Sequence, residues 1–309
     1  MPLHPQVEGL LAAMAAEGGA PIASMSIADA RGMMANVIPL GGEPPAPASV
    51  RDVSIDVDGG QIALRVYTPV GEGPHPITVF FHGGGWVIGD LDSHDPLCRD
   101  LSAGSGSIVV AVDYRLAPEH RFPIAPNDCF AGLQWAVAHA EELGGDGSRV
   151  AVCGDSAGGN LGAVVTQMAR DAGGPAIAFA ALIYPATDMT DEAGSMVENG
   201  IGYFLEKNDM DWFMGHYLTA DDRHHPLASP ALAASLAGLP PTFVAACEYD
   251  PLRDQGVAYA ELLRAAGVPA EAKVYAGLIH AAANMPGVLD GGRELVDDVS
   301  ARLRAALHA

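Results

Sequence analysis

A serine between glycines is the residue of this 309-residue chain best suited to nucleophilic chemistry. Gly154-Asp155-Ser156-Ala157-Gly158 has the pattern G-x-S-x-G and lies between the apolar run 150–153 and the helix-compatible stretch 160–172. A serine in this context sits on a tight, strained turn, which lifts its hydroxyl above a sheet at the N-terminus of a helix. Small neighbours let the strand and helix backbones approach each other. The pattern predicts a nucleophile at Ser156; the alternative is an ordinary glycine-rich turn with a capping serine.

A serine hydroxyl needs a base to take its proton and a third group to orient that base. In hydrolases with this strand–turn–helix motif the acid follows the serine along the chain and the histidine comes last. His280 follows the apolar run 270–275 and a turn at Gly277, which places it at the carboxyl edge of a strand. Sites of open α/β sheets lie at that edge. The sequence therefore predicts His280 as the base, and the alternative is a surface-loop histidine.

The acid is expected to follow a strand in the same way. The run 242–247 leads into Glu248-Tyr249-Asp250-Pro251-Leu252-Arg253-Asp254. Glu248 still belongs with the strand, and Asp254 is better suited to the start of the next helix, where a carboxylate complements the helix dipole. The sequence therefore predicts Asp250 as the acid.

A third glycine-rich stretch offers backbone donors for a negatively charged oxygen. His82-Gly83-Gly84-Gly85-Trp86 follows the apolar run 77–81 and has the HGGG pattern of oxyanion loops. Gly83, Gly84 and the N–H of Ala157 are the expected donors, because glycines leave N–H groups unobstructed. A phosphate-binding loop is the alternative, but neither G-x-G-x-x-G nor G-x-x-x-x-G-K-[ST] occurs. A metal site is also disfavoured, because His82 and His94 lack a spaced set of partner ligands.

The elements that position these motifs alternate between strands and helices. Strands are expected at residues 53–57, 61–67, 77–81, 108–112, 150–153, 178–184, 242–247 and 270–275, with a hairpin turn at 58–60. Helices are expected at residues 22–34, 96–103, 125–143, 160–172, 255–266 and 292–307, after a first apolar face at Val7, Leu10, Leu11 and Met14. This alternation predicts an α/β fold with a mostly parallel eight-stranded sheet flanked by helices.

Two segments fall outside the alternation. Residues 1–48 combine helices with the Gly- and Pro-rich linker 41–48, and residues 187–230 show no strand pattern but include an aromatic helix at 204–218. We expect both segments to form a helical cap over a catalytic core made of residues 49–186 and 231–309. The alternative for the aromatic helix is an ordinary surface helix whose rings pack downward.

Composition limits the classes of function. Lys and Arg number 16 against 38 Asp and Glu, and the formal net charge of −22 argues against nucleic acid and anionic membrane surfaces as partners. The sequence has no basic residue before Arg31, so it lacks the charged start of a secretory signal, and no apolar run reaches the length of a membrane span. The four cysteines are widely spaced and are expected to be buried free thiols, which fits a cytoplasmic location.

Four motifs in order resemble the bacterial hormone-sensitive-lipase family of esterases, over about residues 50–285. They are His82-Gly83-Gly84-Gly85-Trp86, Asp113-Tyr114-Arg115-Leu116-Ala117-Pro118-Glu119, Gly154-Asp155-Ser156-Ala157-Gly158-Gly159 and Asp250-Pro251-Leu252-Arg253-Asp254. The resemblance implies an α/β-hydrolase fold with a cap, no cofactor and no metal, frequent homodimers, and small short- to medium-chain acyl esters as substrates. It assigns the triad to Ser156, Asp250 and His280 and the oxyanion hole to Gly83, Gly84 and Ala157. It further implies that His82, Gly85 and Asp155 support the oxyanion loop and that Trp86, Tyr184, Trp212 and Ala282 line the substrate pocket.

The chain departs from the family pattern after the histidine. The family commonly has Gly and a bulky aromatic there, whereas this chain reads His280-Ala281-Ala282-Ala283-Asn284. One hypothesis is that Ala282 leaves open space beside His280, and the other is that neighbouring side chains fill it. The sequence as a whole predicts a serine carboxylesterase, and the alternatives are an amidase or deacetylase with the same triad and a non-catalytic receptor for small molecules on the same fold.

Overall fold

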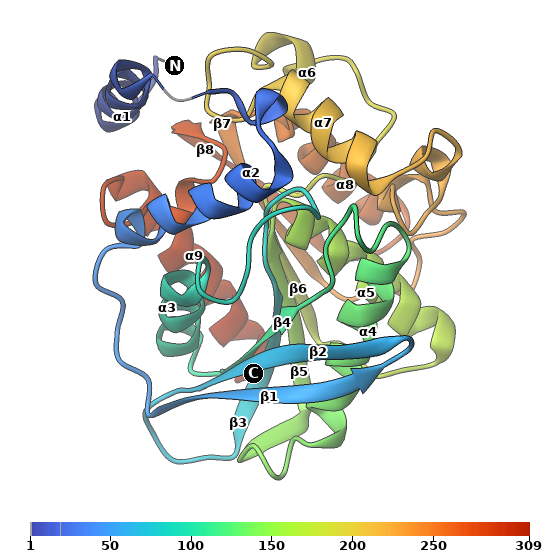
Figure 1. Cartoon of the computed structure of the whole chain (residues 1–309). Coiled ribbons are helices and arrows are strands. Elements are labelled where there is room, and N and C mark those ends of the chain that lie inside the picture. The colour runs from blue at the N-terminus through green and yellow to red at the C-terminus, as the bar shows by residue number, and fades with distance from the viewer. Residues whose placement is uncertain (1, 19) are drawn as a thin grey trace.

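A computed structural model describes residues 2–18 and 20–309, and an eight-stranded sheet forms its centre (Figure 1). The strands lie in the order β1-β2-β4-β3-β5-β6-β7-β8. The first pairings, β1 with β2 and β2 with β4, are antiparallel, and all the others are parallel. This confirms the predicted fold class. The strands are β1 (Ser49–Val57), β2 (Gly60–Thr68), β3 (His75–Phe81), β4 (Ile108–Asp113), β5 (Gly145–Asp155), β6 (Phe179–Ile183), β7 (Thr242–Tyr249) and β8 (Ala270–Ile279).

Helices cover both faces of the sheet. Helices α3 (Asp95–Ser105) and α9 (Asp290–Leu307) lie on one side, and α4 (Ile124–Ala138), α5 (Ala157–Ala172) and α8 (Arg253–Ala265) lie on the other (Figure 1). Side chains alternate between the two faces along each buried strand, so that Val79 and Phe81 pack on one layer while Phe80 packs on the other. Two apolar cores therefore hold the central strands from both sides, which fixes the strand ends that carry the site.

Most expected elements form, and most extend beyond the apolar runs. Two exceptions are the helix expected at residues 125–143, which ends at Ala138, and the strand expected at residues 178–184, which spans Phe179–Ile183. The hairpin turn at Asp58-Gly59 is present between β1 and β2, and β8 continues to Ile279 instead of ending near Tyr275. The helix expected at residues 22–34 is different: a 3-10 turn at Ile22–Ser24 is followed by α2 (Ile27–Met33). The break occurs because the Ser26 side chain caps α2, accepting a hydrogen bond from the backbone N–H of Asp29 at 3.2 Å.

The N-terminal helices and residues 187–230 lie beyond the carboxyl ends of the parallel strands (Figure 1). Residues 187–230 contain no strand and form α6 (Ser195–Glu198) and α7 (Lys207–Tyr217). The first helix, α1 (Pro5–Glu17), begins where the N–H of His4 donates to the carbonyl oxygen of Gly277 in β8. Arg31 of α2 donates to the carbonyl oxygens of Val87 and Ala117, which fixes this helix to the loops beyond β3 and β4.

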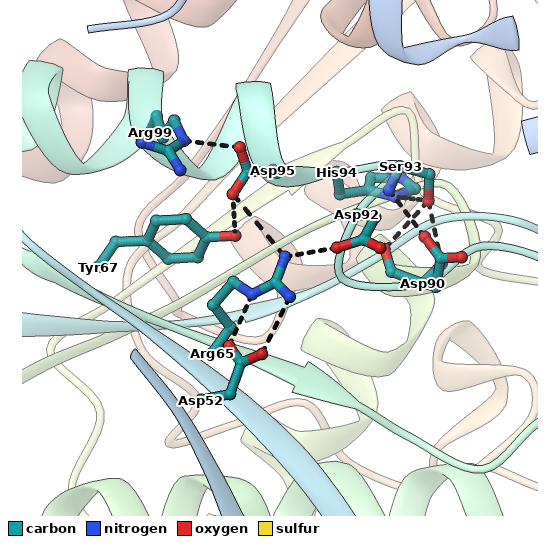
Figure 2. Close-up of polar contacts among 9 residues, drawn as sticks. All are labelled: Asp52, Arg65, Tyr67, Asp90, Asp92, Ser93, His94, Asp95 and Arg99. Atoms are coloured by element: carbon teal, nitrogen blue, oxygen red, sulfur yellow. Dashed lines mark hydrogen bonds and ion pairs between the residues drawn. The ribbon is translucent and has the colours of Figure 1, made fainter. Parts of the chain in front are cut away.

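A charged network holds the loop that precedes α3. Arg65 of β2 bonds Asp52 of β1 at 2.7 Å and Asp92 of the loop at 2.8 Å (Figure 2). The hydroxyl of Tyr67, also on β2, donates to Asp95 at the start of α3. Residues 90–95 are therefore tied to the antiparallel strands, and this loop carries His94 toward the site.

The four cysteines, Cys98, Cys129, Cys153 and Cys247, are buried free thiols, as predicted. In residues 2–18 and 20–309, none of the helices has both the length and the apolar character that crossing a bilayer requires.

Candidate active site

The turn between β5 and α5 presents Ser156 with a strained backbone. Its φ of 56° and ψ of −117° are unusual for a residue with a side chain. A Cβ on Gly154 would collide with the carbonyl of Gly158, and one on Gly158 would collide with the carbonyl of Phe81. Only glycine fits at these two positions, so the sequence pattern of small residues follows from the close approach of strand and helix.

Ser156, His280 and Asp250 lie within hydrogen-bonding distance of one another. His280 Nε2 is 2.8 Å from Ser156 Oγ, and His280 Nδ1 is 2.7 Å from Asp250 Oδ2. Asp250 is 0% exposed, and its other oxygen accepts from the N–H of Leu252 at 2.8 Å. The ring of Tyr184 packs against the His280 ring at 4.6 Å between centroids. The arrangement can move a proton from the serine to the imidazole while the carboxylate holds the ring.

The HGGG loop differs from the prediction in one residue. The N–H of Gly83 donates to Asp155 Oδ1 at 2.8 Å, so it is engaged inside the protein and is not available to an oxyanion. The prediction for Gly83 is therefore contradicted, because Asp155 already accepts its N–H. The same carboxylate explains why this position is a glycine, since a Cβ there would lie 2.6 Å from Oδ2. The N–H groups of Gly84, Gly85 and Ala157 have no acceptor within residues 2–18 and 20–309.

Asp155 is a buried carboxylate whose charge is compensated. Burial raises its pKa, but His94, Asn284 and the N–H of Gly83 outweigh burial, and the pKa lies below its ordinary value. His94 Nε2 is 3.3 Å from Asp155 Oδ1, and Asn284 Nδ2 donates to Asp155 Oδ2 at 2.9 Å. Asp155 thus joins the oxyanion loop to the turn that carries Ser156.

His82 shapes the oxyanion loop and does not approach the serine. Its Nδ1 lies 2.7 Å from the carbonyl oxygen of Gly83, and its ring stacks on Tyr114 at 4.2 Å between centroids. Tyr114 in turn donates its hydroxyl to the carbonyl oxygen of His82 at 2.8 Å. Burial, with a contribution from His94, lowers the pKa of His82 to about 4, so this imidazole is neutral near pH 7.

A cavity of about 90 Å³ opens beside Ser156 and His280. Eight apolar side chains from the N-terminal segment and from residues 204–213 form its wall opposite the sheet. We call these eight residues the apolar lining: Ile22, Met33, Met34, Val37, Phe204, Leu205, Met210 and Phe213.

The expected pocket residues divide into two groups. Trp86 lines the cavity, as do Ala281 and Asn284 from the loop after His280. Trp212 does not line the cavity, and its ring makes edge contacts with the rings of His216 and Phe213. Ala282 is 0% exposed and lies in the core beneath α9, because a 3-10 turn at Ala282–Asn284 directs it into the protein. Tyr184 contacts His280 without lining the cavity, so the pocket role expected for Trp212, Ala282 and Tyr184 is not what the structure shows.

Sequence reasoning missed several residues of the site. Asn284 was expected only as part of an unusual stretch, His94 only as a poor metal ligand, and most of the lining had no assigned role. The sequence offered only weak grounds to place Asn284 and His94 in the site. Each follows a motif by a few residues, and whether its side chain reaches the site depends on how the intervening loop folds. The lining could hardly be recognised in the sequence, because apolar residues occur throughout the chain. Only the adjacent methionines Met33 and Met34 were suggestive of it.

The chain is similar in sequence and in structure to known esterases. A sequence profile described as the alpha/beta hydrolase fold matches residues 78–284. Esterase LipI of Mycobacterium tuberculosis is 43% identical over 264 residues, which cover 84% of this chain and 82% of that protein. The ethyl acetate hydrolase of Pseudomonas putida is 38% identical over 261 residues, 82% of each chain. Among solved structures, the hyperthermophilic esterase from the archaeon Pyrobaculum calidifontis has a TM-score of 0.95 at 40% identity, with 100% of both chains covered.

The fold and the matched profile together define an α/β hydrolase. The chain belongs to this family, among the esterases that resemble hormone-sensitive lipase, and it is a carboxylic ester hydrolase.

Proposed function

We propose that this enzyme hydrolyses short- to medium-chain acyl esters with Ser156 as nucleophile, His280 as general base and Asp250 as the orienting acid. The observation that carries the proposal is the pair of contacts at His280, 2.8 Å to Ser156 Oγ and 2.7 Å to Asp250 Oδ2. These distances are those of hydrogen bonds, and the order along the chain is the one expected for this fold.

The reaction follows from this geometry. Ser156 Oγ attacks the ester carbonyl while His280 Nε2 takes its proton, and the buried carboxylate of Asp250 stabilises the imidazolium that forms. The tetrahedral intermediate collapses when His280 returns the proton to the leaving alcohol, which leaves an acyl group on Ser156. Water then attacks this acyl group with the same base, and the acid is released.

The backbone donors for the oxyanion are assigned to Gly84, Gly85 and Ala157. These N–H groups have no acceptor in the described part of the chain, whereas that of Gly83 is engaged by Asp155. Gly84 and Gly85 have φ values of 115° and 58°, which glycine adopts at low cost. Each donor is worth about 3 kcal/mol of barrier, on the scale found when such donors are removed from other hydrolases.

The two segments beyond the sheet are assigned to a cap that sets substrate size. They contribute the apolar lining, and the cavity of about 90 Å³ is small compared with ordinary ligand pockets of roughly 300–1,000 Å³. A related protein is named for ethyl acetate, an ester with a two-carbon acyl group. The small cavity and this relative both favour the short end of the acyl range.

Labelling of Ser156 tests the proposal. A fluorophosphonate probe is expected to modify Ser156 in the wild-type enzyme and nothing in Ser156→Ala, and Ser156→Ala is expected to lose ester hydrolysis while its circular dichroism is unchanged. Ser54→Ala removes an exposed serine of β1 and serves as the matched control, with full activity and full labelling. Activity in Ser156→Ala, or labelling at a different serine, would overturn the assignment.

A substrate series separates an esterase from an amidase or deacetylase. Chromogenic esters of rising acyl length are compared with the anilide of the same acyl group. We expect rapid hydrolysis of acetate to butyrate esters and much slower cleavage of the anilide. Faster cleavage of the anilide would favour the amidase instead.

A further inference from the structure

Asn284 occupies a position between three segments that must stay aligned during the reaction. It lies four residues after His280, in the 3-10 turn Ala282–Asn284, and it lines the cavity. Its Nδ2 donates to Asp155 Oδ2 at 2.9 Å and lies 3.3 Å from the hydroxyl of Tyr184. A carboxylate accepts and cannot donate, so the amide nitrogen must face Asp155.

Asp155 connects this amide to the rest of the site. Its other oxygen accepts from the N–H of Gly83 in the oxyanion loop at 2.8 Å and lies 3.3 Å from His94 Nε2. Asp155 also directly precedes Ser156. One carboxylate therefore accepts from the oxyanion loop and from Asn284 in the loop that carries His280, and it lies beside His94 of the loop before α3.

The contact of Asn284 with Tyr184 adds a second restraint on the histidine. The Tyr184 ring packs against the His280 ring at 4.6 Å between centroids, with an angle of 55° between the planes. Tyr184 is 1% exposed, so its ring is fixed by the core beneath it. Asn284 thus contacts the neighbour of the base on one side and the neighbour of the nucleophile on the other.

We propose that Asn284 is a positioning residue for ester hydrolysis, which acts through Asp155 and Tyr184 to hold the His280 loop in register with Ser156 and the oxyanion loop. This inference rests on the proposed function, since it assumes that Ser156 and His280 react. The bond has a charged acceptor inside the protein, where such hydrogen bonds are strong and sensitive to the loss of one partner.

Replacing the amide by a carboxylate makes the role visible in the pH profile. In Asn284→Asp two carboxyl groups face each other at hydrogen-bond distance in a buried site, and they cannot both ionise readily, so they share one proton. While the proton is present it restores the bond to Asp155 Oδ2. When it leaves, the two charges repel and the loops separate, so activity is lost as the pH rises.

Other titratable groups face the same site from several elements, and all of them are present in the wild type as well. His94 and His82 face Asp155 from the loops after β3, and Tyr184 and His280 lie on the side of Asn284. The remaining groups that interact with Asp155 are Tyr114, Cys98 and Cys153. A difference between Asn284→Asp and wild type therefore reports the introduced carboxylate.

The experiment measures kcat and KM for a short-chain ester between pH 5 and pH 10 in wild type, Asn284→Asp and Asn284→Ala. In the wild type, kcat is expected to rise with pH to a plateau. In Asn284→Asp, kcat is expected to rise and then fall, by roughly tenfold or more at the alkaline end, with KM little changed. In Asn284→Ala, kcat is expected to be roughly tenfold to a hundredfold lower across the whole range.

Controls separate the possible outcomes. Asn127→Asp places the same charge on an exposed position of α4 and is expected to keep the wild-type profile. An alkaline plateau for Asn284→Asp, or a wild-type kcat for Asn284→Ala, would overturn the inference. Near-UV circular dichroism checks folding, and if Asn284→Asp does not fold, the kcat of Asn284→Ala decides. Fluorophosphonate labelling is run in parallel: a failure to label Ser156 in wild type would refute the proposed function, whereas normal labelling with unaltered profiles would refute only the role of Asn284.

Discussion

Two regions meet at the cavity and are held by different forces. The catalytic edge, which we define as the triad with Asp155 and the HGGG loop, is fixed by directed hydrogen bonds of 2.7–2.9 Å. The apolar lining opposite it consists of aliphatic, methionine and phenylalanine side chains held by packing. Phe213 is one point of contact between the regions, since its ring lies against Gly85 so closely that a Cβ on Gly85 would collide with it.

The difference indicates how each region tolerates change. A directed hydrogen bond in a buried site loses much of its value when one partner is altered, because the remaining group is left without water or a partner. Packed apolar side chains, methionine in particular, adapt to new volumes at smaller cost. We therefore expect substitutions at the catalytic edge to abolish activity and substitutions in the lining to change which esters are used.

The largest effect is expected at the triad acid. Asp250→Asn should lower kcat by about 10⁴-fold, since an amide can neither stabilise the imidazolium nor fix the correct tautomer. Asp254→Asn is the matched control, because Asp254 accepts from the N–H of Ser195 at 2.8 Å and pairs with Arg253, away from His280. Steady-state kinetics of both variants measure the difference. If Asp254→Asn proves inactive and Asp250→Asn active, the acid has been assigned to the wrong residue.

Low pH is expected to reduce the free energy of unfolding, because His82 in the catalytic edge is buried in its neutral form. The pKa of His82 is about 4 in the folded protein and 6.5 in an unfolded chain, because burial disfavours its charged form. Between these values the unfolded chain binds a proton that the folded protein does not, so stability falls as the pH drops from about 6.5 to about 4, by about 3 kcal/mol in total.

Urea unfolding at several pH values measures this loss of stability at acid pH. His82→Phe keeps an aromatic ring on Tyr114 and removes the titration, so its stability should depend less on pH than that of wild type over the same interval. His120→Phe replaces an exposed histidine and should retain the wild-type dependence. Equal slopes for His82→Phe and wild type would show that another group causes the acid loss.

A smaller effect is expected in the lining. Phe213→Leu removes part of the ring beside Gly85 and should raise kcat/KM for longer acyl chains relative to acetate, by about fourfold for each methylene that enters the new space. Trp212→Leu is the control on the same helix, because Trp212 does not line the cavity, and its ester preference should be that of wild type. Unchanged preference in Phe213→Leu would mean that α7 does not limit acyl length.

The same contrast explains what the sequence could predict. The alternation of strands and helices predicted the sheet, and the motifs at its carboxyl edge predicted Ser156, Asp250 and His280, because each follows a strand whose end is fixed by the core. The oxyanion donors were predicted one residue early at Gly83, since the sequence does not show that Asp155 already occupies that N–H.

Other features depend on contacts between distant segments. Asn284 and His94 meet at Asp155 only because two loops fold back to it, and no spacing rule encodes that meeting. The break in the helix expected at residues 22–34 depends on a single cap at Ser26. The lining draws on two segments without a motif, and apolar residues in them are equally consistent with an ordinary core.

The smallest effect on catalysis is expected at Ala282, which the sequence suggested as open space beside His280. Ala282 is 0% exposed and packs in the core with residues of α9, and a Cβ on Gly292 would collide with its carbonyl oxygen. Ala282→Phe therefore overfills a closed core and should cost roughly 1–3 kcal/mol of stability. Because the position lies outside the cavity, the ratio of kcat/KM for butyrate and acetate esters should remain that of wild type. Thermal unfolding and the ester series measure the two quantities together. A selective loss of activity on bulky esters with unchanged stability would instead place Ala282 at the pocket wall. In that case the loop that follows His280, and not only the apolar lining, would determine which esters are used.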